Sequence, residues 1–176
     1  MIEPMREPEL PLVERGTNPD LRLLTQARKD YFAMLRDGTE CPCCDRYGKV
    51  YRRKFTSAMA RFLIAMYRLD AKEPGTWVHA LRDVAYKLGI GGDYGKTLLW
   101  RLIEKRPGGK DDGNPDGGQY RITEKGRSFV EGRLRIEKHK FVYHDRVMQV
   151  EEGPVDELSI REALGAGFDY NELMGA

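Results

Sequence analysis

Residues 80–106 read ALRDVAYKLGIGGDYGKTLLWRLIEKR, and residues 119–130 read QYRITEKGRSFV, with a loop rich in Gly, Asp and Pro between them. Apolar side chains recur at helical spacing on both sides of the glycine cluster, and Thr123 is a good helix N-cap. The predicted elements are a helix over 77–88, a turn over 89–92, a helix over 94–106, a loop over 107–118, a strand over 119–123 and a helix to residue 132. This order predicts an α+β fold.

The first of these segments resembles the regulators of the MarR and related winged-helix superfamily. The resemblance depends on the residues that would pack the two helices, namely Ala85, Leu88, Ile90, Leu98, Leu99, Leu102 and Ile103. Gly89 is expected to take the left-handed backbone that closes the turn. Downstream, YRITEKG at 120–126 resembles the strand that ends a wing and leads into the last helix. The resemblance covers residues 57–132 and implies a winged helix-turn-helix core, whose second helix enters the DNA major groove.

The second helix supplies most of the predicted contacts with double-stranded DNA. Its solvent-facing side is expected to carry Asp93, Tyr94, Lys96, Thr97, Trp100, Arg101 and Lys105. Lys96, Thr97 and Arg101 suit phosphates or base edges, and Tyr94 and Lys105 complete the predicted interface. Two features argue against this interpretation. Gly95 has no side chain at a position where a contact with the groove is expected. The loop GGKDDGNPDGG at 108–118 contains three aspartates and only one lysine, so its charge is unfavourable for binding phosphates. Since winged helices also bind proteins, a protein partner is the alternative.

Charge is unevenly distributed along the 176 residues, whose net charge is only +2. Residues 41–106 carry 14 basic and 6 acidic side chains, a net charge of +8, whereas residues 145–176 carry 2 and 8, a net charge of −6. The basic centre suits phosphate groups, and the acidic tail could fold back onto it or weaken nonspecific DNA binding. Arg52, Arg53 and Lys54 are further predicted DNA contacts. The alternative is a solvated strand edge, where charge prevents aggregation.

The flanking segments complete the predicted organisation. Four regions are expected: an irregular or disordered N-terminus at 1–17, a helix and cysteine knuckle at 18–56, the winged-helix domain at 57–132, and a β-hairpin with an acidic helical tail at 133–176. Asn18–Pro19 and Asp37–Gly38 mark the predicted start and end of the first helix. A strand over 49–55 and a helix over 57–69 are expected next. Near the C-terminus, the predicted hairpin has strands over 134–136, 140–143 and 147–150 with a turn at His144–Asp145. Ser159 and Glu162 predict a capping box, and Asp169 begins a last helical turn that ends at Met174.

All three cysteines lie in the sequence Cys41-Pro42-Cys43-Cys44, which is too local for a disulfide framework. Cys41 and Cys44 have the C-x2-C spacing that lets two thiolates hold one tetrahedral zinc ion. The chain has no second C-x2-C, so Asp45, His79, His139 or His144 would have to complete the site. The alternative is a reduced cluster of thiols in a turn.

Other chemistries have little support. Residues 91–97 superficially suggest a phosphate-binding loop, but Ile90 stands where the pattern needs glycine, and a helix precedes it instead of a strand. No pattern of a hydrolase, zinc protease or cysteine nucleophile occurs, so the protein is not expected to be an enzyme. No apolar run approaches the ~20 residues of a membrane helix. The N-terminus lacks a signal-peptide pattern, which predicts a cytoplasmic location.

The segments CPCCDRYGKVYRRK and SIREALGAGFDYNELM are similar to sequences in small uncharacterised bacteriophage proteins. This resemblance implies a bacterial host cytoplasm. The predicted function is that of a DNA-binding winged-helix protein, a phage-type transcriptional regulator or accessory factor. The alternative is a phage-encoded module that binds and inhibits a host protein. The first helix and the acidic tail are both candidate homodimer interfaces.

Overall fold

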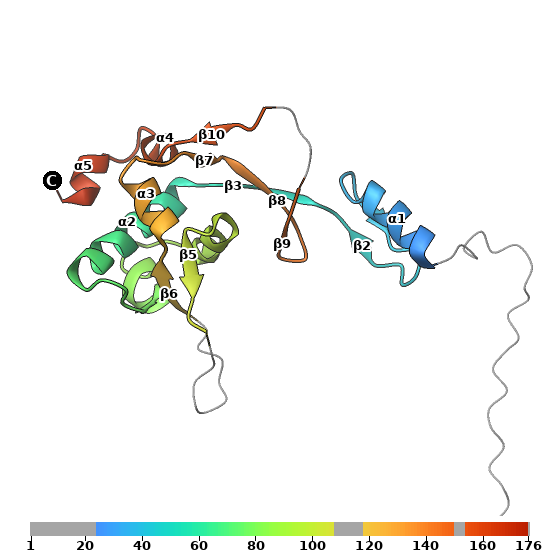
Figure 1. Cartoon of the computed structure of the whole chain (residues 1–176), viewed down its shortest axis with the longest axis horizontal. Coiled ribbons are helices and arrows are strands. Elements are labelled where there is room, and N and C mark those ends of the chain that lie inside the picture. Colours follow the sequence, from blue (N-terminus) through green and yellow to red (C-terminus); the bar gives the residue numbers. More distant parts are fainter. Residues whose placement is uncertain (1–23, 108–117, 150–153, 176) are drawn as a thin grey trace, which may run out of the picture. The chain divides into compact units, whose positions relative to one another are not determined.

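The computed structural model describes residues 24–107, 118–149 and 154–175. It divides the chain into two compact units, Met1–Lys49 and Val50–Ala176. Both contain helices and strands, which confirms the predicted α+β class (Figure 1). None of the described helices is long and apolar enough to cross a membrane.

The first unit joins one helix to a short hairpin. Its elements are α1 Leu24–Met34, β1 Thr39–Glu40 and β2 Tyr47–Gly48, and the two strands pair antiparallel. The predicted stop after α1 is confirmed, because Gly38 has a φ of 96° and its N–H donates to the Met34 carbonyl at 3.2 Å. The predicted start at Asn18–Pro19, like the predicted irregular N-terminus, lies outside the described residues. Only glycine fits at position 48, because a Cβ there would lie 2.0 Å from the Tyr31 hydroxyl oxygen.

The second unit is built around α2, Ser57–Lys72, which packs against helices and strands from most of the unit. Thr56 caps the start of α2 by accepting a hydrogen bond from the Met59 N–H. One face of the helix is buried and contains Met59, Ala60, Phe62, Leu63, Ile64, Met66 and Asp70. At its end, Asp70 binds Arg127 through two hydrogen bonds of 2.7 and 3.0 Å, which fixes α2 to a later helix.

The region after α2 alternates short helices with a three-stranded antiparallel sheet. Its elements are β4 Val78–His79, the π-helix η1 Ala80–Ala85, the 3-10 helix η2 Gly92–Trp100, β5 Ile103–Lys105, β6 Gln119–Ile122 and α3 Glu124–Val130. The sheet order is β4-β6-β5, with Val78 opposite Tyr120 and Ile103 opposite Ile122. The predicted loop over 107–118 lies almost wholly outside the described residues.

The predicted helix over 94–106 is wrong in its second half. η2 ends at Trp100, and Arg101 follows with a left-handed φ of 58° while its N–H donates to the Leu98 carbonyl at 2.8 Å. The chain then enters β5, because Ile103 is buried and pairs with β6. The predicted helix over 77–88 likewise begins later, since Val78 and His79 form β4.

The C-terminal part adds two small sheets and two helical turns. Its elements, with the earlier strand β3, are β3 Tyr51–Lys54, β7 Ile136–Glu137, β8 His139–Tyr143, β9 Arg146–Met148, β10 Glu157–Leu158, α4 Ile160–Leu164 and α5 Tyr170–Met174. The orders are β3-β8-β9 and β10-β7, both antiparallel. The predicted hairpin turn is confirmed, because His144 and Asp145 both have positive φ, as a type I′ turn requires. Figure 1 shows the helices of this unit gathered around α2, with β3, β8 and β9 extending from them.

The capping box before α4 is also confirmed. Glu162 accepts hydrogen bonds from the Ser159 N–H at 2.6 Å and its hydroxyl at 2.8 Å, while the Glu162 N–H donates to the Ser159 hydroxyl. Arg135 adds an ion pair at 2.9 Å. The Ser159 backbone N–H is the main cause that lowers the pKa of Glu162 from 4.5 to about 2, and the hydroxyl and Arg135 contribute further.

The YRITEKG segment connects β6 to α3 and packs closely against the backbone at Arg101 and Leu102. Thr123 caps α3 by accepting from the Gly126 N–H at 3.0 Å, and its hydroxyl donates to the Arg101 carbonyl at 2.8 Å. A Cβ at Gly126 would lie 2.1 Å from the Leu102 carbonyl oxygen, which is backbone and has no freedom to move aside. The segment therefore needs glycine at 126 for close approach of two backbones.

We expect Gly126→Ala to lower the free energy of unfolding by about 1–3 kcal/mol, the usual effect of overpacking. Urea denaturation measures this change. Gly95→Ala is the matched control, because a Cβ at Gly95 meets no atom within 4 Å. Equal stability of the two variants would contradict the close approach.

We expect the stability that Glu162 contributes to depend on pH. Because its folded pKa lies below its unfolded pKa, the contribution is complete above about 4.5 and is lost as the pH falls towards about 2. Glu162→Ala should therefore be less stable than the wild type at neutral pH, and the difference should shrink in acid. Denaturation curves recorded at falling pH test this. A difference that stayed constant would show that the carboxylate charge is unimportant.

Candidate functional site

The predicted turn between η1 and η2 is closed by backbone hydrogen bonds around Gly89. Gly89 has a φ of 62°, which confirms the expected left-handed turn. The Ile90 N–H donates to the Ala85 carbonyl at 2.9 Å, and the Ile90 side chain is buried. Arg61 of α2 donates to the Leu88 carbonyl at 3.1 Å. The turn is therefore fixed at both ends, and it holds η1 against η2.

The 3-10 geometry of η2 changes which of its side chains reach solvent. A 3-10 helix has 3.0 residues per turn, so Tyr94, Thr97 and Trp100 form one row. This row faces inward: Tyr94 stacks on Phe62 with ring centroids 5.1 Å apart, and Thr97 and Trp100 are 0% and 1% exposed. The Thr97 hydroxyl donates to the Tyr94 carbonyl at 2.6 Å. The prediction that Thr97 and Trp100 face solvent is therefore wrong, and Tyr94 is only partly accessible.

Three basic residues of the predicted interface reach the surface of this region. Lys96 forms an ion pair with Asp93 at 2.5 Å, and both side chains remain open to solvent. Arg101 is exposed immediately after η2, and Lys105 is exposed on β5, opposite Tyr120. Because an exposed ion pair contributes little, an incoming phosphate can replace Asp93 as the partner of Lys96.

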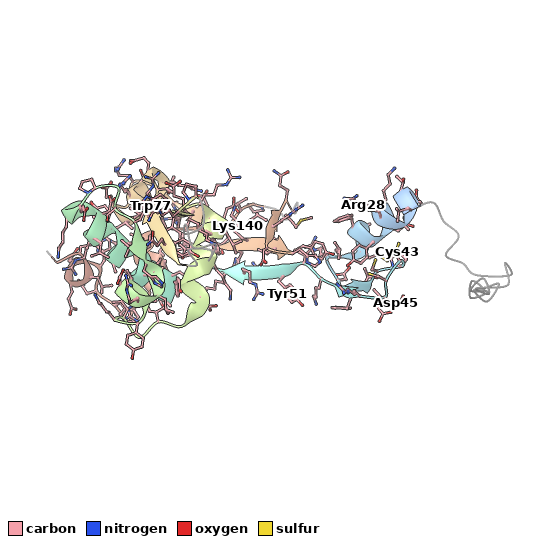
Figure 2. The ribbon with its side chains drawn as sticks, turned by 90° about the horizontal axis from the view of Figure 1, so that it is seen from below. Arg28, Cys43, Asp45, Tyr51, Trp77 and Lys140 are labelled. Carbon is pink, nitrogen blue, oxygen red and sulfur yellow. The ribbon has the colours of Figure 1, made fainter. Side chains whose placement is uncertain are left out.

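The predicted basic strand lies at the edge of the β3-β8-β9 sheet. Arg52, Arg53 and Lys54 are all exposed. Arg53 stacks over the Tyr51 ring at 5.2 Å, and Arg52 hydrogen-bonds the His139 Nδ1 at 3.2 Å. Across the ladder, Arg53 lies opposite Lys140, so like charges face each other (Figure 2 labels Lys140 and Tyr51). Such like-charge pairing is unfavourable, and Glu137 offsets part of it through an ion pair with Lys140 at 2.6 Å.

A pocket of about 940 Å³ lies between η2, α3 and the β8-β9 hairpin. Its charged lining is mostly basic and contains Arg52, Arg101, Lys125, Lys140, Glu137 and Asp156. Sequence reasoning missed Lys125 and Lys140, because no spacing rule links a lysine in the first turn of α3 to one in a strand. The YRITEKG match includes Lys125, but only as part of the turn.

The cysteines form a tight knuckle between β1 and β2 in the first unit. The Cys41 N–H donates to the Arg46 carbonyl at 2.9 Å, and the Asp45 N–H donates back to the Cys41 carbonyl at 2.9 Å. Asp45 has a φ of 57°, which lets the loop close (Figure 2 labels Cys43 and Asp45). None of the three thiols is in a disulfide, and Cys43 and Cys44 are exposed.

The Cys41 sulfur is surrounded by donors. The backbone N–H of Cys43 is the main cause that lowers the pKa of the Cys41 thiol, and the thiol and backbone N–H of Cys44 lower it further. The thiolate is the form that binds metals. The knuckle therefore holds Cys41 and Cys44 together in a form suited to a cation.

The other predicted zinc ligands have local roles. His79 caps η1 by accepting from the Arg82 N–H at 3.3 Å, and His139 is hydrogen-bonded to Arg52. The His144 ring packs edge-on against Tyr143. Over residues 24–107, 118–149 and 154–175, no group of three or more His, Cys, Asp or Glu side chains forms a complete metal site. Within the described part of the first unit, Cys41 and Cys44 lie in one tight turn, and no group of three or more possible ligands forms there.

Function has to be inferred from these residues and their geometry. No protein-family model, curated protein or solved structure matches this chain.

Proposed function

We propose that Ser57–Val130 is a winged helix-turn-helix that binds double-stranded DNA, as a transcriptional regulator or accessory factor. The observation that carries this proposal is the sheet order β4-β6-β5, in which the last strand lies between the other two. With α2 before the sheet and η1 and η2 between β4 and β5, this order is typical of a winged helix. The β5-β6 hairpin then corresponds to the wing.

The side chains that remain available narrow the proposed DNA interface. Lys96 and Arg101 flank the exposed side of η2, and Lys105 lies at the base of the wing hairpin. Tyr94 and Thr97 act indirectly, because their contacts with Phe62 and within η2 hold the helix in place. The wing sequence carries three aspartates and one lysine between 108 and 118. The wing should therefore contribute little to phosphate binding.

A protein partner is the second candidate, and one observation favours it. On η1 and just after it, Leu81 is 49% exposed and Tyr86 is 83% exposed. Large apolar and aromatic side chains at the surface are typical of protein interfaces, where Tyr is enriched. This helix would then bind a host protein in place of DNA.

Mobility shifts with random and genomic duplex fragments at low salt test the DNA proposal. We expect Arg101→Ala to weaken binding by about 1–3 kcal/mol, roughly 5- to 150-fold, because an Arg that reads a base contributes that much. Lys96→Ala should weaken binding less, to a similar degree on all fragments. Lys72→Ala is the control, because it removes an exposed charge at the far end of α2.

The same assay has an outcome that removes the DNA proposal. Absence of a shift with every duplex, together with a stoichiometric protein partner that survives nuclease treatment, favours the second candidate. Leu81→Asp should then abolish capture of that partner.

We also propose that Cys41 and Cys44 supply two thiolates to a zinc ion. The support is the knuckle, in which the N–H groups of Cys44 and Asp45 donate to the Cys41 carbonyl at 3.3 and 2.9 Å and so hold Cys41 and Cys44 in one turn. A tetrahedral site takes four ligands, so two must come from elsewhere. Cys43, Asp45, a histidine or the knuckle of a second copy can complete it.

Elemental analysis of tag-free protein tests the zinc proposal. We expect about one zinc per chain, or about half of one if two chains share the ion, in keeping with four ligands per zinc. Cys41→Ser and Cys44→Ser should lose the metal, whereas Cys43→Ser should keep it unless Cys43 is a third ligand. Less than roughly a tenth of an equivalent in the wild type would rule zinc out.

A further inference from the structure

We propose that the basic pocket between η2, α3 and the β8-β9 hairpin binds an organic phosphate of nucleotide size. This small-molecule site shares Arg52 and Arg101 with the proposed DNA interface and differs from it by Lys125, Lys140 and the β8-β9 hairpin. All the residues that line it belong to the second unit. The argument rests on the charge of the lining, the backbone of Arg101 and the apolar wall of the pocket.

The pocket has more positive charge than its own acidic groups neutralise. Glu137 is paired with Lys140 at 2.6 Å, and Asp156 is paired with Lys138 at 2.9 Å. Both acids of the lining are therefore already engaged. In the part of the chain that the structure describes, Arg101 and Lys125 have no anionic partner, and Arg52 is bonded only to a histidine ring. A dianionic group is the ligand that this arrangement lacks.

Lys125 shows the effect of this charge. Loss of part of its hydration is the main cause that lowers its pKa; Lys140 lowers it further, Glu137 opposes this, and Arg101 adds a smaller lowering effect. Three cationic side chains, from the residue after η2, from α3 and from β8, therefore act on one another across the pocket. A bound phosphate would relieve the repulsion among them.

The backbone directs Arg101 to this place. Its φ of 58° and ψ of 32° are left-handed, the conformation in which many helices end. The conformation is fixed from both sides, because its N–H donates to the Leu98 carbonyl and its carbonyl accepts from the Thr123 hydroxyl. The turn at the end of η2 thus holds the backbone of Arg101 at the lining of the pocket.

Part of the pocket wall is apolar. The apolar lining residues include Leu99, Phe141, Val147, Met148 and Val155. Val147 and Val155 are 43% and 63% exposed, so they lie open to a ligand. A volume of about 940 Å³ falls in the range of small-molecule sites and far exceeds one phosphate ion. The ligand should therefore combine a phosphate with a flat or apolar body, as a nucleotide does.

Isothermal titration calorimetry on the full chain tests the proposal. The probes are AMP, GMP, CMP and UMP, the four matching nucleosides, and inorganic phosphate. We expect at least one nucleotide to bind saturably, and both its nucleoside and inorganic phosphate to bind at least about tenfold more weakly, since each lacks half of the contacts.

Two variants locate the binding. Lys125→Ala should weaken nucleotide binding at least about tenfold, as expected for loss of a charged hydrogen-bonding partner. Val155→Asp places a negative charge in the apolar wall and should weaken binding to a similar extent. Both positions are exposed, and thermal denaturation checks that each variant folds. The control is Lys72→Ala, which changes an exposed residue in the last turn of α2. This variant should bind nucleotides as tightly as the wild type does.

Several results would overturn the proposal. These are the absence of saturable binding by any nucleotide, equal binding of nucleoside and nucleotide, or full binding by both variants. A single-stranded oligonucleotide could instead bind more tightly than every nucleotide, with the same dependence on Lys125. The ligand of the pocket would then be the end of a nucleic-acid strand, and the small-molecule proposal would be wrong. Duplex binding is measured separately and should survive Lys125→Ala, so failure of this site and failure of the DNA proposal are distinguishable.

Discussion

Burial of the Trp100 indole is the interaction on which the second unit depends. Its ring is 1% exposed and meets Phe55 edge-on at 5.2 Å, and Phe55 in turn meets Phe129 at 5.5 Å. The indole N–H donates to the Glu137 carbonyl at 2.6 Å, so this buried donor is paired. Each such aromatic pair adds about 0.5–1.5 kcal/mol beyond the area that it buries. Trp100 thus joins the end of η2 to β7 and to Phe55, the residue that follows β3, and Phe55 joins them to α3.

This anchor also explains where the functional side chains lie. With Trp100 held inside, η2 cannot continue along its axis, and Arg101 makes the left-handed turn that brings Ile103 into β5. The row formed by Tyr94, Thr97 and Trp100 packs into the core. Of the basic residues on η2 and directly after it, Lys96 and Arg101 consequently remain able to contact ligands. The packing that stabilises the fold thus limits the side chains that can read DNA or hold a phosphate.

Local signals in the sequence predicted the parts of the fold that local chemistry determines. The caps at Thr123 and Ser159 and the turn at His144–Asp145 are confirmed, because each is decided by neighbouring residues. The extent of η2 was predicted wrongly, since the apolar residues 102 and 103 suit a helix and a buried strand equally well. The pocket was missed because it is assembled from residues far apart in the chain, with Arg52, Lys125 and Lys140 brought together only by the β3-β8 pairing and by α3.

The acidic tail clarifies why positive charge remains at the end of η2. Residues 145–176 have a net charge of −6, enough to neutralise much of the basic centre. In the described part of the tail, however, Asp156 pairs with Lys138 and Glu162 pairs with Arg135. Both partners lie outside the basic stretch 41–106. Glu162 is held by the Ser159 cap, and the pKa of Asp156 is lowered mainly by Lys138 and to a smaller extent by Arg52 of β3. Among the described residues, Arg101 and Lys125 are left without an ion-pair partner, and an anion from outside the chain can satisfy both.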